Sequence, residues 1–314
     1  MSETARILVG IDGGEGGRAA LRYAAADAER SGDELWLVHV APPPTVPGVV
    51  YPYIAPTPVG HDRELGAGLL ERAVKEAMTL APADRVTSTL VRGDAADGLV
   101  QMAAATRLVV LGGHHHSALE RIFTGSVVNR VAGYAPVAVA VVPEPWPAGA
   151  GADRVVVAVK DCDDAAGLVA RAMSEAADRG AELVILHVWQ VPTPYDGLSL
   201  SQRDLAEWDA ALRHELEDTL ERARRHRSAP AALVEVRIEV RQGQPAQVIA
   251  AAAAESDLLV IGRRRHAFPA GRLGSTGRAL LRVSRCPVEV LPPVLDIVEA
   301  DELSGSQPAE VTGS

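Results

Sequence analysis

The chain contains the same succession of segments twice, and this internal repeat constrains the fold more than any other feature. Six pairs of segments match in the same order: RILVGID at 6–12 with RVVVAVK at 154–160, LWLVHV at 35–40 with LVILHV at 183–188, Arg92-Gly93 with Gln242-Gly243, RLVVLGG at 107–113 with DLLVIGR at 257–263, Gly125-Ser126 with Gly274-Ser275, and APVAVAVV at 135–142 with CPVEVL at 286–291. The partners lie about 150 residues apart throughout. One chance match would mean little, but six in one order predict a tandem duplication.

The length of 314 residues fits two domains of about 150 residues each. We predict one domain at 1–145 and another at 150–293, joined by the Pro-, Gly- and Ala-rich segment 143–153. Residues 294–314 combine several acidic residues with Ser, Gly and Pro, so we expect a mostly disordered tail.

Short apolar runs alternate with helical patterns inside each half. In the first half these patterns predict strands and helices at the following places: strands at 6–11, 34–40, 85–91, 107–112 and 137–142, and helices at about 15–31, 61–79, 94–105 and 125–133. Strands that alternate with helices in this way predict an α/β fold with a parallel, doubly wound sheet in each half.

Composition and charge argue against several classes of protein. The net charge of −10 disfavours a nucleic-acid-binding protein that depends on phosphate attraction, and also a membrane-surface protein. No apolar run approaches the roughly 18 residues that span a bilayer, and no GxxxxGK(S/T) motif is present to form a P-loop. Two cysteines, Cys162 and Cys286, cannot make a disulfide scaffold, so we expect a cytoplasmic protein.

The segment 41–60 holds seven of the 21 prolines, too many for a helix or a central strand. We therefore expect a long loop there. Two interpretations stay open, a plain surface connection and a lid over a pocket.

Ligands of open α/β sheets bind beyond the carboxyl ends of the strands, where the strand order reverses. The first strand ends in Ile11-Asp12-Gly13-Gly14 and the fourth in Gly112-Gly113. If these strands are neighbours, Asp12 is an acceptor suited to a sugar hydroxyl or a bound cation, and the glycines let backbone approach a ligand. Gly125-Ser126 is expected to begin the next helix, whose N-terminus favours a phosphate.

These residues resemble the fingerprint of the universal stress proteins, over residues about 4–143 and 153–292. The family pattern is Gly, two residues, Gly, nine residues and Gly-Ser/Thr, and the first half reads GGHHHSALERIFTGS at 112–126. Gly112 and Gly125-Ser126 stand at the expected places, while His115 replaces the second glycine. Asp12 matches the family's Asp after the first strand, and His39-Val40 its His-Val at the end of the second.

The resemblance implies two tandem five-stranded sheets of strand order 3-2-1-4-5 and an adenine-nucleotide site. It implies that the Asp contacts the ribose region, that the Val backbone meets adenine and that the glycine loop with its Ser holds the phosphates. The first-half residues that it nominates, with their neighbours, are Ile11, Asp12, Gly13, Val40, Gly112, Gly113, His115, Gly125, Ser126 and Val127. ATP, with or without Mg²⁺, is the expected ligand, and AMP or a cyclic nucleotide stays open.

The second half departs further from the family pattern. Lys160 replaces the Asp, and the loop GRRRHAFPAGRLGS at 262–275 is one residue shorter, with Arg265 at the second glycine position. We expect Lys160, Arg263, Arg264 and Arg265 to crowd this crevice with positive charge, which suits phosphate oxygens. A weaker second site would comprise Lys160, Val188, Gly262, Arg265, Gly274 and Ser275. A structural half that has lost its ligand stays open.

No metal site is expected in this chain. Consecutive residues of an extended segment point alternately, so His114-His115-His116 cannot easily share one tetrahedral zinc ion. We expect Cys162 to be partly exposed near the second crevice and Cys286 to be buried.

The fifth strands, at 135–142 and 286–291, are apolar and lie at the sheet edges in the family's strand order. An exposed apolar edge invites aggregation, so we expect these edges to pair antiparallel and to join the halves as a pseudo-dimer. A homodimer of whole chains stays open, and neither nucleic acid nor a membrane is an expected partner.

Three functions stay open. The leading one is a tandem universal stress protein that binds an adenine nucleotide and regulates the stress response in the cytoplasm. The second is a slow ATPase that uses the same crevice, although the chain offers no obvious catalytic base and we nominate no catalytic residue. The third is an interaction or scaffold protein that binds no nucleotide, which the substitutions His115, Lys160 and Arg265 favour.

Overall fold

The computed structural model of the chain describes residues 5–43, 61–113, 121–146, 153–163, 165–190, 201–225, 233–263 and 273–293. The expected tail at 294–314 and residues 44–60 of the expected loop lie outside these ranges. The predictions for these two segments therefore stay predictions.

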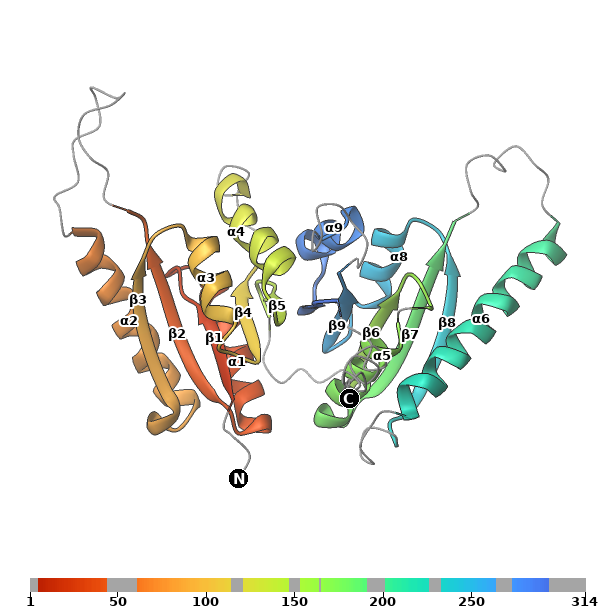
Figure 1. Cartoon of the computed structure of the whole chain (residues 1–314), viewed down its shortest axis with the longest axis horizontal. Helices are drawn as coiled ribbons and strands as arrows, with labels where there is room; N and C mark the ends of the chain where they lie inside the picture. The colour runs from red at the N-terminus through yellow and green to blue at the C-terminus, as the bar shows by residue number, and fades with distance from the viewer. Residues whose placement is uncertain are drawn as a thin grey trace, which may run out of the picture.

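The described strands form one 10-stranded sheet in which the two halves lie side by side (Figure 1). Its strand order is β3-β2-β1-β4-β5-β10-β9-β6-β7-β8. The strands are β1 (Arg6–Gly10), β2 (Glu34–Ala41), β3 (Val86–Arg92), β4 (Leu108–Gly112), β5 (Ala138–Val142), β6 (Arg154–Val159), β7 (Glu182–Trp189), β8 (Val236–Gln242), β9 (Leu258–Gly262) and β10 (Val288–Leu291). Each half therefore has the order 3-2-1-4-5, which confirms the predicted doubly wound α/β fold.

Helices connect the parallel strands, because a parallel pair needs a crossover connection. They are α1 (Glu15–Ser31), α2 (His61–Leu80), α3 (Ala95–Ala103) and α4 (Arg121–Tyr134) in the first half, and α5 (Ala166–Arg179), α6 (Gln202–Arg225), α8 (Pro245–Ala252) and α9 (Ser275–Val283) in the second. A short 3-10 turn, Ala83–Arg85, precedes β3. Among these described helices, none has both the length and the apolar character needed to cross a membrane.

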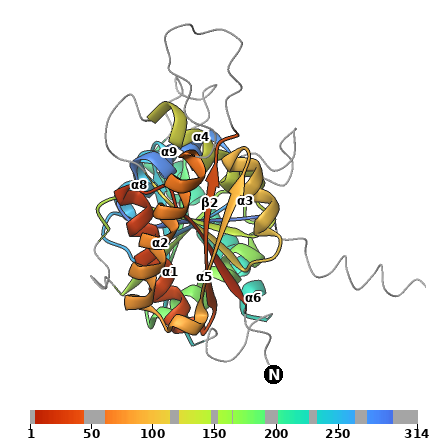
Figure 2. The same cartoon turned by 90° about the vertical axis from the view of Figure 1, so that its left-hand side faces the viewer.

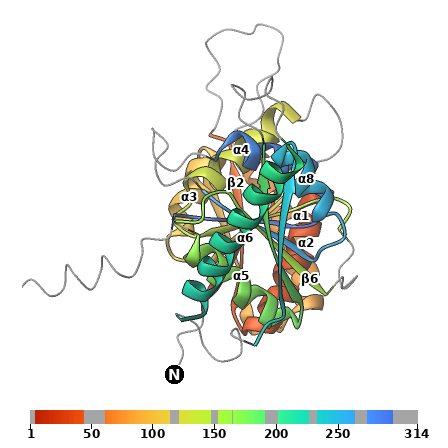
Figure 3. The same ribbon diagram turned by 90° about the vertical axis from the view of Figure 1, so that its right-hand side faces the viewer.

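The helices cover both faces of the sheet, and a hydrophobic core fills each face. Viewed from the end of the first half, α1 and α2 lie on one side of β2 and α3 lies on the other (Figure 2). The same two layers are seen from the opposite end, where α6 is in front (Figure 3). The α1–α5 core contains buried side chains of α1, α2, α5 and α6, and the α4–α9 core those of α3, α4, α8 and α9. Each core takes residues from both halves, so both cores continue across the junction.

The junction is the antiparallel pairing of β5 with β10, as predicted. Val139 lies opposite Val290, Ala140 opposite Glu289 and Val141 opposite Val288. The valines point into the α4–α9 core, and this core therefore runs unbroken from one half to the other. Neither fifth strand is left as an exposed edge, which removes the aggregation hazard of an unpaired apolar strand.

We predict that the double change Val139→Asp and Val141→Asp strongly destabilises the whole chain. The two side chains are 1% and 2% exposed, and burying an unpaired carboxylate costs about 3 kcal/mol or more. Thermal unfolding followed by circular dichroism measures the effect. The matched control is Thr87→Asp with Ser88→Asp, at exposed positions of the edge strand β3. An unfolding midpoint equal to that of the control would contradict the junction as described.

Candidate functional site

The turn between β1 and α1 places the Asp12 side chain at the carboxyl end of β1. Its Oδ1 accepts a hydrogen bond of 2.9 Å from the backbone N–H of Gly14. Gly13 takes a φ of 86°, which favours glycine, and α1 follows two residues later. The side chain of Asp12 is exposed. The carboxylate therefore holds the turn in shape and also faces solvent at the predicted crevice.

Gly112 ends β4 directly beside the start of α1. The strands β1 and β4 are neighbours, with Val9 opposite Val110. A Cβ at Gly112 would lie 2.2 Å from the carbonyl carbon of Gly16. Only glycine permits this approach, so Gly112 has a packing role in addition to the ligand role that the sequence predicts.

Gly113 is held by the neighbouring strand. Its backbone N–H donates to the carbonyl oxygen of Val142 at 2.7 Å. A Cβ at this position would lie 3.3 Å from the same oxygen. The N–H of Gly113 therefore extends the β4–β5 ladder, whereas the sequence analysis assigned this residue to ligand contact.

His39 and Val40 lie near the end of β2, between helices of opposite faces. The Nδ1 atom of His39 lies 2.6 Å from the carbonyl oxygen of Ile11, which ties β2 to the end of β1. Gly66 of α2 packs on the His39 ring, and Gly98 of α3 packs on Val40. The two residues are thus partly packing residues, and Val40 stays half-buried at the rim of the crevice.

The prediction that α4 begins at Gly125-Ser126 is wrong. The helix begins at Arg121, so both residues and Val127 lie inside it, beyond the first turn. Backbone N–H groups inside a helix bond to carbonyl groups of the preceding turn, and so they are not the donors of a helix N-terminus. Ser126 is exposed on this helix.

A further predicted member of this region is His115. His115, together with the rest of His114–His116, lies outside the described residues. The nucleotide and metal predictions for these histidines stay predictions.

The second half presents a different arrangement at the ends of β6 and β9. Lys160 and Gly262 are exposed, and Val188 is half-buried near the end of β7. A Cβ at Gly262 would meet only the Leu168 side chain, at 3.5 Å, which is an ordinary contact. The close approach of helix to strand at Gly112 therefore has no counterpart here. Arg265 lies outside the described residues.

The helix α9 begins at the residues that match Gly125-Ser126 in the repeat. The helix begins at Ser275, with Gly274 as its N-cap in an extended conformation (φ −65°, ψ 171°). Ser275 is exposed and Gly274 half-buried. A helix N-terminus therefore lies at Gly274-Ser275 in the second half, whereas Gly125-Ser126 lie inside α4 in the first.

The prediction that Arg263 lies in the second crevice is wrong. Its Nη2 donates at 2.7 Å to the carbonyl oxygen of Ala135, at the end of α4 in the first half. The guanidinium thus contacts the other half, because the β5–β10 pairing brings the ends of α4 and β9 together. Arg264 lies outside the described residues.

Both thiols are buried, so the predicted partial exposure of Cys162 is wrong, while the prediction for Cys286 is confirmed. Burial raises the pKa of Cys162 to about 11 and that of Cys286 to about 12. A neutral thiol is a poor nucleophile, so neither cysteine is suited to redox chemistry near neutral pH.

Burial also lowers the pKa of His187, the counterpart of His39.

A small cavity of about 70 Å³ lies between α1 and α2, beside the β1–α1 turn. Its lining includes Gly13, Leu69, Arg72 and Glu76. Sites for small molecules usually enclose at least about 300 Å³. A nucleotide therefore does not fit inside this cavity, and the candidate site is the edge of the sheet where β1 and β4 end.

Comparisons with known proteins agree with this fold. The model of the universal stress protein family matches residues 3–143 and again residues 151–292. The chain is 31% identical to universal stress protein Rv1996 of Mycobacterium tuberculosis over 305 residues, which are 90% of this chain and 94% of that protein. It is 34% identical to universal stress protein Rv2005c of the same organism over 299 residues, covering 90% and 96%.

A solved structure also shares the fold. The crystal structure of a universal stress protein from Archaeoglobus fulgidus superposes with a TM-score of 0.66 and 19% sequence identity, covering 93% of this chain and 97% of that one. Together with the two matches of the family model, the curated relatives define the class of protein. The chain belongs to the universal stress protein family, as a tandem member.

We predict that Gly112→Ala destabilises the chain whereas Gly262→Ala does not. The Cβ at position 112 forces α1 away from β4, an overpacking that costs about 1–3 kcal/mol. The corresponding Cβ at position 262 has room beside Leu168. Urea unfolding of both variants measures the difference, and equal losses would show that the contact with Gly16 is not what requires glycine at 112.

Proposed function

We propose that the first half binds an adenine nucleotide, ATP in particular, in the crevice at the ends of β1 and β4. The observation that carries this proposal is the position of Asp12 and Gly112. They follow or end two neighbouring strands at the point where the strand order reverses, the usual ligand position in open α/β sheets. Membership in the family supports the class of ligand.

Asp12 is suited to accept hydrogen bonds from the ribose hydroxyls. The bond from Gly14 fixes the carboxylate before any ligand arrives, so little conformational entropy is lost on binding. The exposed Ser126 hydroxyl is a polar group for the phosphates. Mg²⁺ would neutralise part of the charge of a triphosphate and would find hard oxygen ligands in the carboxylate and the phosphates.

We further propose that the protein acts in the cytoplasm as a regulator of the stress response. Its two free, buried cysteines fit a reducing compartment.

We identify no general base for phosphoryl transfer among the described residues. Measuring phosphate release over hours tests whether the protein hydrolyses ATP slowly. Light scattering with and without ATP tests whether whole chains form homodimers.

A second candidate is an interaction protein that binds no nucleotide. It is favoured by three observations at the crevice: Gly112 is required by packing, the N–H of Gly113 is bonded to Val142, and α4 begins before Gly125. Calorimetric titration of the purified chain with ATP separates the two candidates. Heat of binding supports the nucleotide site, and its absence supports the interaction protein.

We predict that Asp12→Ala weakens ATP binding by roughly 5- to 150-fold, since a lost buried hydrogen bond is worth about 1–3 kcal/mol. Asp12→Asn keeps an acceptor for the N–H of Gly14 and so preserves the turn, but it removes the carboxylate and should also weaken binding. Unchanged affinity in a folded Asp12→Ala variant would show that the residue only shapes the turn.

We predict that ATP binds to one half only, with one nucleotide per chain. Lys160→Ala, at the position equivalent to Asp12, is the matched control and should leave the affinity unchanged. Titration calorimetry gives both the stoichiometry and the affinity. Two equal sites per chain, or a loss of affinity in Lys160→Ala comparable to that in Asp12→Ala, would contradict binding by the first half alone.

A further inference from the structure

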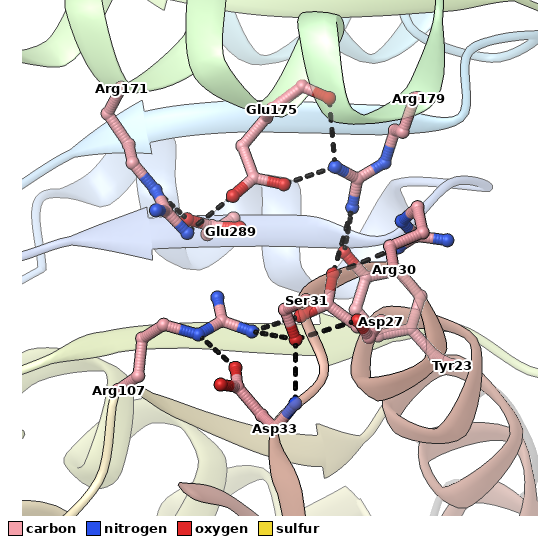
Figure 4. Close-up of polar contacts among 10 residues, drawn as sticks. All are labelled: Tyr23, Asp27, Arg30, Ser31, Asp33, Arg107, Arg171, Glu175, Arg179 and Glu289. Atoms are coloured by element: carbon pink, nitrogen blue, oxygen red, sulfur yellow. Dashed lines mark hydrogen bonds and ion pairs between the residues drawn. The ribbon is translucent and has the colours of Figure 1, made fainter. Parts of the chain in front are cut away.

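A network of polar side chains, most of them buried or partly buried, lies where α1 meets α5, on the face of the sheet that carries the α1–α5 core (Figure 4). We call it the junction network. Its members are Tyr23, Asp27, Arg30 and Ser31 of α1, Asp33, Arg107 before β4, Arg171, Glu175 and Arg179 of α5, and Glu289 of β10. Buried charges are costly unless paired, so the arrangement of these groups restricts which surfaces can meet here.

Arg179 makes the polar contacts of this network that cross from one half to the other. Its Nη2 donates to the Tyr23 hydroxyl at 3.0 Å and lies 3.7 Å from Asp27. The side chains of Arg179 and Asp27 are 9% and 8% exposed, and Tyr23 is 2% exposed. The first half thus supplies the acceptors, and the second half supplies the cation.

Each half also satisfies its remaining charges internally. In the first half, Arg107 pairs at 2.6 Å with Asp27 and at 2.6 Å with Asp33. In the second half, Arg171 pairs with Glu289 at 3.2 Å, and Glu175 contacts both Arg171 and Arg179. Glu289 is 1% exposed, so its carboxylate depends on this pairing.

The two halves place different residues at equivalent positions of α1 and α5. Gly32 and Gly180, both with positive φ, close these helices. Counted back from the two glycines, Tyr23 corresponds to Arg171, Asp27 to Glu175 and Ser31 to Arg179. The network is therefore asymmetric, although the backbone around it repeats.

The same asymmetry holds in the sheet. Ala140 and Glu289 occupy equivalent positions, because they pair with the equivalent residues Val110 and Val260. They also lie directly opposite each other across β5 and β10. Side chains at such opposed positions have Cβ atoms about 4.5–5.5 Å apart. One large acidic side chain therefore shares the space with one methyl group.

We propose that the junction network makes the second half a partner for a first half only, and that it rejects a second copy of the second half. Two second halves joined by the same strand pairing would place Glu289 opposite Glu289. Two buried carboxylates at that spacing repel each other and do not both fit where Ala140 leaves room. Arg179 would meet Arg171 at the position of Tyr23.

Two first halves joined in this way would lack what the second half supplies. Ala140 would face Ala140, and the space that Glu289 occupies would be empty. The Tyr23 hydroxyl would lose the donor Arg179 while remaining buried. The mixed pair is thus the combination that satisfies both surfaces, and the partner of each surface is the other half of a chain.

The test recreates the rejected pairing inside the full-length chain. Ala140→Glu places a carboxylate opposite Glu289, and Ala140→Gln places a neutral side chain of the same size there. At pH 8.5 we expect Ala140→Glu to lower the thermal midpoint by about 10 °C more than Ala140→Gln does. Equal losses in the two variants would overturn the proposal, because size alone would then account for them.

The pH dependence of this difference separates charge from shape. Burial and, next, the Glu175 carboxylate raise the pKa of Glu289 to about 7, against the opposing effects of Arg171 and Arg179. Asp27 and Tyr23 of α1 face the same region and add no cation. A raised pKa means that acidification neutralises Glu289 more readily than an ordinary carboxyl, so the gap between the two variants should shrink from pH 8.5 to 6.0. A gap that is unchanged between pH 8.5 and 6.0 contradicts the proposal.

A third variant covers the case in which Ala140→Glu does not fold. Combining it with Glu289→Ala leaves one carboxylate at the junction, exchanged between the strands. We expect this double variant to fold and to recover at least half of the lost midpoint. Failure of the double variant to fold, alongside a folded Ala140→Gln chain, would overturn the proposal.

Discussion

The antiparallel pairing of β5 with β10 is the constraint on which the rest of this structure depends. It converts two five-stranded sheets into one and lets both hydrophobic cores continue from half to half. It also brings α1 against α5, which buries the junction network, and the end of β9 against the end of α4, where Arg263 bonds to Ala135. The two crevices are consequently parts of a single framework.

Much of this fold could be predicted from the sequence because the strands are buried on both faces. Such strands read as apolar runs, and the repeat showed that they occur in the same order twice. The junction network could not be predicted in this way. Glu289 is one acidic residue in an otherwise apolar strand, and its partner Arg171 lies on a distant helix that reads as ordinarily amphipathic. Only the packing of α5 on the sheet brings them together.

The candidate site, too, could be predicted from the sequence only in part. Its place in the sheet and its acceptor Asp12 follow from the strand order and from a polar residue after an apolar strand. The roles of the glycines could not be predicted from the sequence, because a glycine allows the close approach of either a ligand or a helix. At Gly112 the neighbour is the backbone of Gly16, and at Gly113 it is the carbonyl of Val142. These contacts shape the crevice whether or not a ligand occupies it.

The central claim is that the junction makes the two halves one cooperative unit. Differential scanning calorimetry of the full-length chain tests it most directly, because a two-state unit has equal calorimetric and van't Hoff enthalpies. We expect a single endotherm in which the ratio of the two enthalpies is about one. Two resolved endotherms, or a ratio near two, would mean that each half unfolds by itself and would contradict the account.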